Sequence, residues 1–125
     1  MIRPGWDEYF LGIARAVAAR SDCDRDKVGA VVVDSDRRIR STGYNGAPPG
    51  RPGCSVCPRR LSGVESGSDY SNCVAIHAEA NALLYADRDD LPGSTLYVTR
   101  EPCYACEKLI AATGIVRIVT PESVE

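Results

Sequence analysis

Two short segments of the chain carry side chains that together suit a catalytic metal ion. The first segment contains His77 and Glu79, two residues apart, and the second contains Cys103 and Cys106, three residues apart. Imidazole nitrogen and thiolate sulfur are the usual ligands of zinc, and a catalytic zinc takes three protein ligands and keeps a fourth position open. His77, Cys103 and Cys106 supply three such ligands. The carboxylate of Glu79 is then available to move protons as a general acid and base.

Each segment alone has a more ordinary interpretation. A single histidine in an apolar helix is usually a core or surface residue, and a Cys-x-x-Cys pair can be a redox motif of the thioredoxin kind. The redox interpretation leaves Glu79 and His77 without a role, although His77 is the only histidine of the chain. Burying the Glu79 carboxylate in an apolar stretch without a partner would be costly. The combination of the two segments therefore favours a metal centre.

The composition is that of an ordinary soluble globular protein. The chain has 125 residues, of which 44% are hydrophobic and 26% are charged, so we expect a single domain over residues 1–125. The net charge of -2 gives no basic field for a nucleic acid polymer. The sequence contains neither an apolar run of about 18 residues nor the apolar core of a signal peptide at its start. We therefore expect a cytoplasmic protein without membrane contact.

Six cysteines in a chain of this length could also form a disulfide scaffold. Disulfides persist in oxidising compartments, whereas thiols in the cytoplasm stay reduced. Without an export signal, the spacings Cys54-x-x-Cys57 and Cys103-x-x-Cys106 are more typical of metal sites than of disulfides.

Hydrophobic periodicity predicts helices and strands that alternate along the chain. Helices are predicted over residues 6–20, 74–85 and 104–113, and strands over 28–33, 38–44, 95–99 and 116–120. The first two strands form a hairpin, and residues 43–72 form a long loop rich in Gly, Pro and Ser. This order of elements predicts a three-layer α/β domain with a mixed sheet.

These elements bring the chemical groups to the beginnings of two helices. His77 and Glu79 fall in the first turns of the helix over 74–85, and Cys103 and Cys106 lie at the start of the helix over 104–113. Residues three apart share one face of a helix, so both sulfurs point the same way. The positive end of the helix dipole is expected to lower the pKa of a nearby thiol and to stabilise the thiolate that zinc requires.

The order H-x-E followed by P-C-x-x-C is the signature of zinc-dependent nucleobase deaminases. Further segments extend the resemblance from about residue 6 to residue 120. Over this range the chain resembles the deoxycytidylate (dCMP) deaminase family in the segments WDEYF at 6–10, VGA at 28–30, STGYNG at 41–46 and HAEANA at 77–82. The resemblance implies a cytidine-deaminase-like three-layer α/β/α sandwich, with a mixed sheet of four to five strands.

The resemblance also implies a reaction, a cofactor and partners. The expected activity is hydrolytic deamination of a cytosine-type nucleotide, most directly dCMP to dUMP and ammonia. Zinc on His77, Cys103 and Cys106 is the expected cofactor, with Glu79 as the catalytic residue. The expected partners are a small-molecule substrate and further copies of the chain in a homo-oligomer. Family members continue past the fourth strand with a helix and often a fifth strand, which we expect to be absent here because the sequence ends at Glu125.

Two other functions stay open at this point. One is a deaminase of a different nucleoside or of a free or modified nucleobase. The other is a zinc module that binds a nucleotide without turnover, which the presence of Glu79 disfavours. Release of ammonia from any substrate would exclude the second.

The substrate-binding candidates are Asn45, Ala78, Arg20, Arg25 and Lys27. Asn45 resembles the family asparagine that hydrogen-bonds the sugar, although Tyr-Asn-Gly is also a common turn composition. The three basic residues lie between the first helix and the first strand, where they could bind a phosphate. They could equally form a solvated cluster of surface charges.

Four cysteines are not used by the expected catalytic zinc, and four thiols match the ligand count of a closed structural zinc site. These residues are Cys23, Cys54, Cys57 and Cys73. They bracket the long loop, whose ordering a second zinc would stabilise. The resemblance supports this possibility, since some phage relatives carry a second zinc near the positions of Cys23 and Cys54. The alternative is that these cysteines are small apolar residues of the core.

Overall fold

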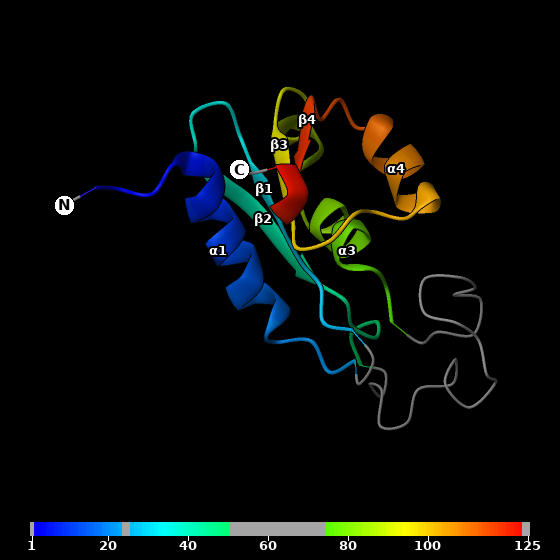
Figure 1. Cartoon of the computed structure of the whole chain (residues 1–125). Coiled ribbons are helices and arrows are strands. Elements are labelled where there is room, and N and C mark those ends of the chain that lie inside the picture. Colours follow the sequence, from blue (N-terminus) through cyan, green and yellow to red (C-terminus); the bar gives the residue numbers. More distant parts are fainter. Residues whose placement is uncertain (1, 24–25, 51–74, 124–125) are drawn as a thin grey trace.

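In the computed structural model, the chain folds into a four-stranded sheet with helices on both faces (Figure 1). The structure describes residues 2–23, 26–50 and 75–123. The spatial order of the strands is β2-β1-β3-β4, and their bounds are β1 Gly29–Val33, β2 Ile39–Tyr44, β3 Thr95–Val98 and β4 Arg117–Val119. β1 is antiparallel to both β2 and β3, whereas β3 and β4 are parallel. The predicted mixed sheet is therefore confirmed.

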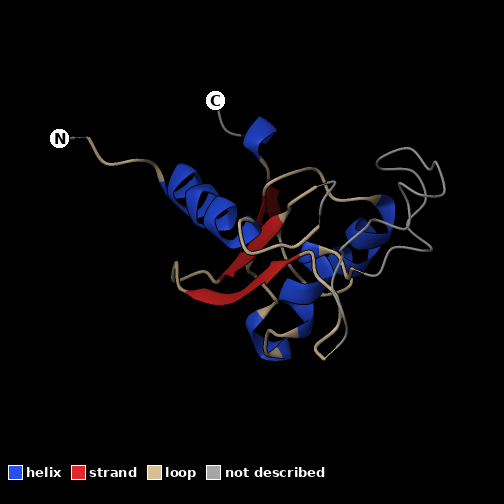
Figure 2. Cartoon of the chain, turned by 90° about the horizontal axis from the view of Figure 1, so that it is seen from below, coloured by secondary structure: helices blue, strands red, loops and turns tan. Residues whose placement is uncertain are grey.

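The helices form the two outer layers, as the view from below shows (Figure 2). One face of the sheet is covered by α1 (Trp6–Ala18), and the other by α3 (Ala78–Leu84) and α4 (Tyr104–Ala111). Two short 3-10 helices, η1 (Arg88–Asp90) and η2 (Pro121–Ser123), lie in the connections. Among the described residues, no helix combines the length and the apolar character that crossing a membrane requires.

The central strand β1 is buried along its whole length, which explains its continuous apolar sequence GAVVV. Successive side chains of a strand point to opposite faces of the sheet. Val31 and Val33 accordingly pack with Phe10 of α1, whereas Ala30 and Val32 pack in the core beneath α3 and α4. A cluster of buried apolar side chains thus lies on each face of the sheet, and β1 contributes to both clusters.

The second predicted helix begins later than expected. It was expected over residues 74–85, but α3 begins at Ala78, and residue 74 lies outside the described residues. Ile76 instead pairs with Gly46 in an isolated antiparallel bridge, with N···O distances of 2.8 and 3.1 Å. This pairing keeps the backbone extended through His77, at φ -61° and ψ 151°. The placement of His77 inside the helix was therefore wrong, because His77 is the residue that precedes α3.

The other predicted elements are present with slightly shorter bounds. The 3-10 helices were not predicted, because three residues are too few to show a period. Part of the predicted loop over 43–72 belongs to β2, and its residues from 51 onward lie outside the described residues.

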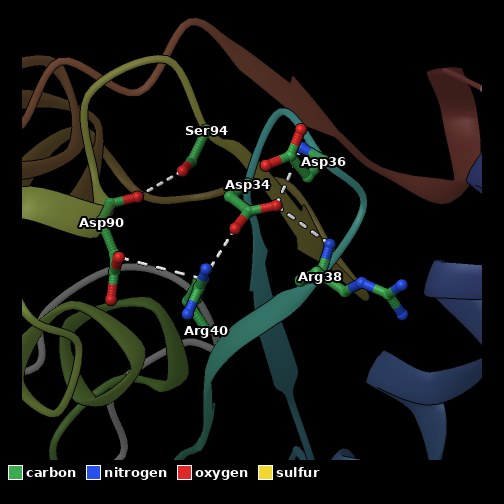
Figure 3. A network of polar contacts seen from close by, with 6 residues as sticks. All are labelled: Asp34, Asp36, Arg38, Arg40, Asp90 and Ser94. Carbon is green, nitrogen blue, oxygen red and sulfur yellow. Dashed lines mark hydrogen bonds and ion pairs between the residues drawn. The ribbon is translucent and has the colours of Figure 1, made fainter.

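A polar network fixes the turn between β1 and β2 (Figure 3). Asp34 Oδ1 accepts hydrogen bonds from the backbone amides of Asp36 and Arg38, at 2.9 and 3.0 Å. Asp34 Oδ2 accepts from Nε of Arg40 at 2.6 Å, and that nitrogen lies 3.8 Å from Asp90 Oδ1. The amide of Arg38 and the guanidinium of Arg40 hold the pKa of Asp34 below its usual value.

At Gly43 of β2, the backbone of α3 lies directly against the sheet. A Cβ atom added at Gly43 would lie closer than 3.0 Å to the Ala78 carbonyl oxygen and the Ala82 amide nitrogen. Both are backbone atoms of α3, so the helix itself would have to move. We expect Gly43→Ala to lower the free energy of unfolding by about 3 kcal/mol or more, at the upper end of the usual cost of overpacking. Urea denaturation of the purified variant measures this loss.

Gly12 of α1 offers the matched control for that substitution. A Cβ atom added at Gly12 meets nothing within 4 Å, and the residue is exposed. Gly12→Ala should raise stability by up to about 1 kcal/mol, since alanine is the better helix former. Equal stabilities for the two variants would contradict the close packing of α3 on β2.

Candidate metal centre

The predicted metal ligands meet where α3 and α4 begin. His77 directly precedes α3, Cys103 directly precedes α4, and Cys106 lies in the first turn of α4. His77 Nδ1 lies 3.3 Å from the sulfur of Cys106 and 3.6 Å from that of Cys103. All three ligand atoms fall within 4.8 Å of one another. The structure thus brings His77 together with the two cysteines, which lie 26 and 29 residues later in the sequence.

The chemistry of these donors fits zinc. One imidazole and two thiols form a soft, three-ligand set, whereas magnesium and calcium prefer oxygen ligands. Cys106 is buried, while His77 and Cys103 are partly exposed. The centre is therefore held by the core on one side and accessible to a ligand on the other.

The buried position of the Cys106 thiol affects its acidity. Burial raises its pKa, and the nearby Glu79 and Cys103 raise it further. The loss of hydration of a buried thiolate disfavours its charged form, and the expected lowering of the pKa by the helix end stays a prediction. A divalent cation between the ligand atoms supplies the missing positive charge. Deprotonation of Cys106 is therefore coupled to metal binding.

Glu79 lies beside this centre in the first turn of α3, and only 4% of its surface is exposed. Burial raises the pKa of the Glu79 carboxyl, while its own backbone amide and the positive charge of Arg100 lower it. A buried carboxyl with a raised pKa can both accept and return a proton, which is what a general acid and base must do.

Two side-chain hydrogen bonds fasten α3 to β2 and so fix the position of Glu79. Asn81 Nδ2 donates to the Tyr44 carbonyl oxygen at 2.9 Å, and Ser41 Oγ donates to the Ala82 carbonyl oxygen at 2.6 Å. The Asn81 amide also lies 3.4 Å from the Ile76 carbonyl oxygen. These bonds join the helix, the strand and the segment that leads into His77.

Asn45 is buried, and its side chain organises the loop before β1. Its Oδ1 accepts from the Val28 amide at 2.9 Å, and its Nδ2 donates to the Asp26 carbonyl oxygen at 2.7 Å. The Ser21 hydroxyl donates to the Asn45 carbonyl oxygen at 2.7 Å. The structure thus gives Asn45 a scaffolding role, and its contact with a sugar stays a prediction.

The remaining substrate-binding candidates have different surroundings. Ala78 belongs to the core beneath α3, with 1% of its surface exposed. Arg20 lies over the Tyr44 ring, with its guanidinium carbon 5.9 Å from the ring centroid. Lys27 is exposed, and Arg25 lies outside the described residues. A phosphate site formed by these basic residues stays a prediction.

The predicted four-cysteine site falls mostly on residues that the structure does not describe. Cys23 is buried, and its amide donates to Ser21 Oγ at 3.2 Å. Cys54, Cys57 and Cys73 lie outside the described residues. The second zinc therefore stays a prediction.

Sequence reasoning missed an ion pair near the centre, between Arg100 and Asp26. Arg100 follows β3, and the preceding residue, Thr99, exchanges two hydrogen bonds with Gly29 at 3.0 and 3.1 Å. An isolated arginine forms no motif, and its partner lies 74 residues away in the sequence. Only its position three residues before Cys103 could have drawn attention to it.

Comparison with known proteins relates the chain to deaminases whose family is defined by a zinc-binding region. The family model for the cytidine and deoxycytidylate deaminase zinc-binding region matches residues 4–122. The deoxycytidylate deaminase of Mycobacterium phage D29 is 72% identical over 127 residues, covering 98% of each chain. The deoxycytidylate deaminase of Schizosaccharomyces pombe is 41% identical over 94% of this chain, which spans 37% of that longer protein.

A solved structure shares the architecture. The dCMP deaminase from cyanophage S-TIM5, crystallised in complex with dCMP and dUMP, superposes with a TM-score of 0.78 at 31% sequence identity. The match covers 96% of this chain and 83% of the cyanophage chain. The expected cytidine-deaminase-like fold is therefore confirmed.

Proposed function

Because the chain belongs to the cytidine and deoxycytidylate deaminase zinc-binding family, we propose that it is a zinc-dependent hydrolase that converts dCMP and water to dUMP and ammonia. The observation that carries the proposal is the convergence of one imidazole and two thiols within 4.8 Å, beside the buried Glu79. The 72% identity to the phage D29 deoxycytidylate deaminase supports this substrate.

The chain's own residues divide the chemistry between them. His77, Cys103 and Cys106 hold the zinc ion, which when bound supplies the Lewis acidity that makes water a nucleophile at neutral pH. Glu79 accepts the proton that water loses as its oxygen bonds to C4 of the cytosine ring, and delivers a proton to N3. As the bond from C4 to the exocyclic nitrogen breaks, Glu79 takes the proton of the new C4 hydroxyl and passes it to the amine, which leaves as ammonia while C4 becomes a carbonyl. The ring that remains is uracil.

Ammonia release from a panel of substrates tests this function. The zinc-loaded protein is assayed with dCMP, deoxycytidine, cytidine, cytosine and guanine. We expect kcat/KM for dCMP to exceed that for deoxycytidine by orders of magnitude, since a site with charged phosphate donors leaves them unpaired when the phosphate is missing. Comparable values for dCMP and deoxycytidine would favour a nucleoside or base deaminase. Ammonia from none of them would favour the non-catalytic zinc module.

The domain organisation, the cellular location, the class of partner and the oligomeric state are further proposals. We propose a single deaminase domain over residues 1–125, acting in the cytoplasm on a small molecule rather than on a nucleic acid polymer. The net charge of -2 supports the absence of polymer binding. Exposed apolar side chains on α4, Tyr104 and Leu109, support assembly into a homo-oligomer.

A further inference from the structure

A positive charge lies next to the proposed active site, and the mechanism above does not use it. Arg100 is the second residue after β3 and stands three residues before Cys103. Its charge lies close enough to the buried Glu79 carboxyl to act on it. Its Nη1 is paired with the Asp26 carboxylate, in the loop that precedes β1. Arg100 therefore lies between that loop and the catalytic residues.

The backbone around Arg100 is fixed by the sheet. β1 lies between β2 and β3, so the end of β3 and the end of β2 flank the start of β1. Thr99 exchanges two hydrogen bonds with Gly29, while Asn45 binds backbone groups of Asp26 and Val28 from the other side. The segment 26–28 is thus held by Asn45 on one side and by Arg100 on the other. The guanidinium is in this way oriented before any ligand arrives.

The ion pair itself contributes little to the stability of the fold. The Arg100 and Asp26 side chains are 42% and 41% exposed, and exposed ion pairs add at most about 1 kcal/mol. A guanidinium has five N–H donors in a planar fork, so pairing through Nη1 leaves donors for a ligand. The fork matches a phosphate better than a single ammonium does. An oriented, solvent-accessible arginine beside the reacting centre therefore suits recognition of an anion.

We propose that Arg100 is a specificity-determining residue that binds the 5′-phosphate of the nucleotide, and that Asp26 positions its guanidinium beforehand. This inference rests on the proposed function, because it assumes a nucleotide whose base is held near Glu79. It assigns the phosphate to Arg100 rather than to Arg20, which lies over the Tyr44 ring, or to the exposed Lys27.

The test compares a substrate that has the phosphate with one that lacks it. Arg100→Gln and Arg100→Lys are assayed on dCMP and on deoxycytidine, and the binding of dUMP and deoxyuridine to the same zinc-loaded proteins is measured by calorimetry. Arg117→Gln is the matched control, because Arg117 also pairs with an aspartate, Asp7, but does so between β4 and α1. The unchanged zinc content of each variant verifies that the metal centre is intact.

We expect Arg100→Gln to lower kcat/KM for dCMP and the affinity for dUMP by about 10- to 100-fold, the usual range for one charge-assisted hydrogen-bonded contact. The effect should fall on KM more than on kcat, and the values for deoxycytidine and deoxyuridine should change less than threefold. Arg100→Lys should recover part of the loss, and Arg117→Gln should behave as the parent.

Equal losses for the substrates with and without phosphate would overturn the proposal, because a merely structural role would affect both. Unchanged dCMP kinetics in Arg100→Gln would overturn it as well. Failure of the proposed function is a separate outcome, since the parent protein itself would then release no ammonia from dCMP. In that case the selective loss of dUMP affinity still decides whether Arg100 binds the phosphate.

Discussion

Replacing Glu79 by glutamine should lower kcat on dCMP by about 10²–10⁴-fold, the usual contribution of one general acid and base. The amide keeps the size of the side chain but cannot accept the proton of the attacking water. Zinc content should not change, because the ligand atoms come from His77, Cys103 and Cys106. Steady-state kinetics together with elemental analysis of the purified variant measures both quantities.

Glu107→Gln is the matched control, because Glu107 lies in the first turn of α4 but is exposed. It should retain parental activity. The folded state of Glu79→Gln should be at least as stable as that of the parent, since burial disfavours the ionised Glu79 carboxylate and raises its pKa. A rate for Glu79→Gln within tenfold of the parent would refute its catalytic role, and a lower melting temperature would point to a loss of structure instead.

The ligand set could be predicted because its information is local. Two cysteines three residues apart imply a common direction on one helix, and a histidine two residues before a glutamate places an imidazole and a carboxylate on one short segment. The alternation of helices and strands then implies that the two elements meet. The structure confirms this meeting, with His77 Nδ1 at 3.3 Å from the Cys106 sulfur.

The start of α3 could not be predicted because a distant residue decides it. The apolar pattern continues upstream of Ala78 and favours a longer helix. Pairing of Ile76 with Gly46, thirty residues earlier, supplies the hydrogen bonds that the additional helical turn would have made. The residues before Ala78 have only a weak intrinsic preference for helix over extended backbone, and the tertiary pairing with Gly46 decides between the two.

The surroundings of the site were harder to predict for the same reason. Asn45 was recognised as important, but its partners, Asp26 and Val28, follow from the pairing of β1 with β2. Arg100 carries no motif at all, and its proximity to Asp26 depends on β1 lying next to β3. Residues whose role arises from strand order are visible only once the sheet has been assembled.

Loss of one metal ligand should have the largest effect on the reaction. We expect Cys103→Ser to lower zinc content by one equivalent per chain and kcat/KM for dCMP by at least about 10³-fold, since Lewis-acid catalysis supplies several kcal/mol and each 1.36 kcal/mol is a factor of ten. Cys103 is the better choice than the buried Cys106, because it is partly exposed and its replacement leaves the core unchanged. Elemental analysis and ammonia assays on the same preparation measure the two losses together.

Metal removal from the unmodified chain provides the complementary experiment. A chelator should abolish activity, and zinc should restore it while magnesium should not, because magnesium binds poorly to sulfur and imidazole ligands. Cys23→Ser controls for the loss of a cysteine elsewhere and should keep the zinc at His77, Cys103 and Cys106 together with activity well above that of Cys103→Ser. Two equivalents of zinc in the parent, one of them lost in Cys23→Ser, would identify the predicted four-cysteine site. Full activity after complete zinc removal would show that the three converging ligand atoms do not form the catalytic centre.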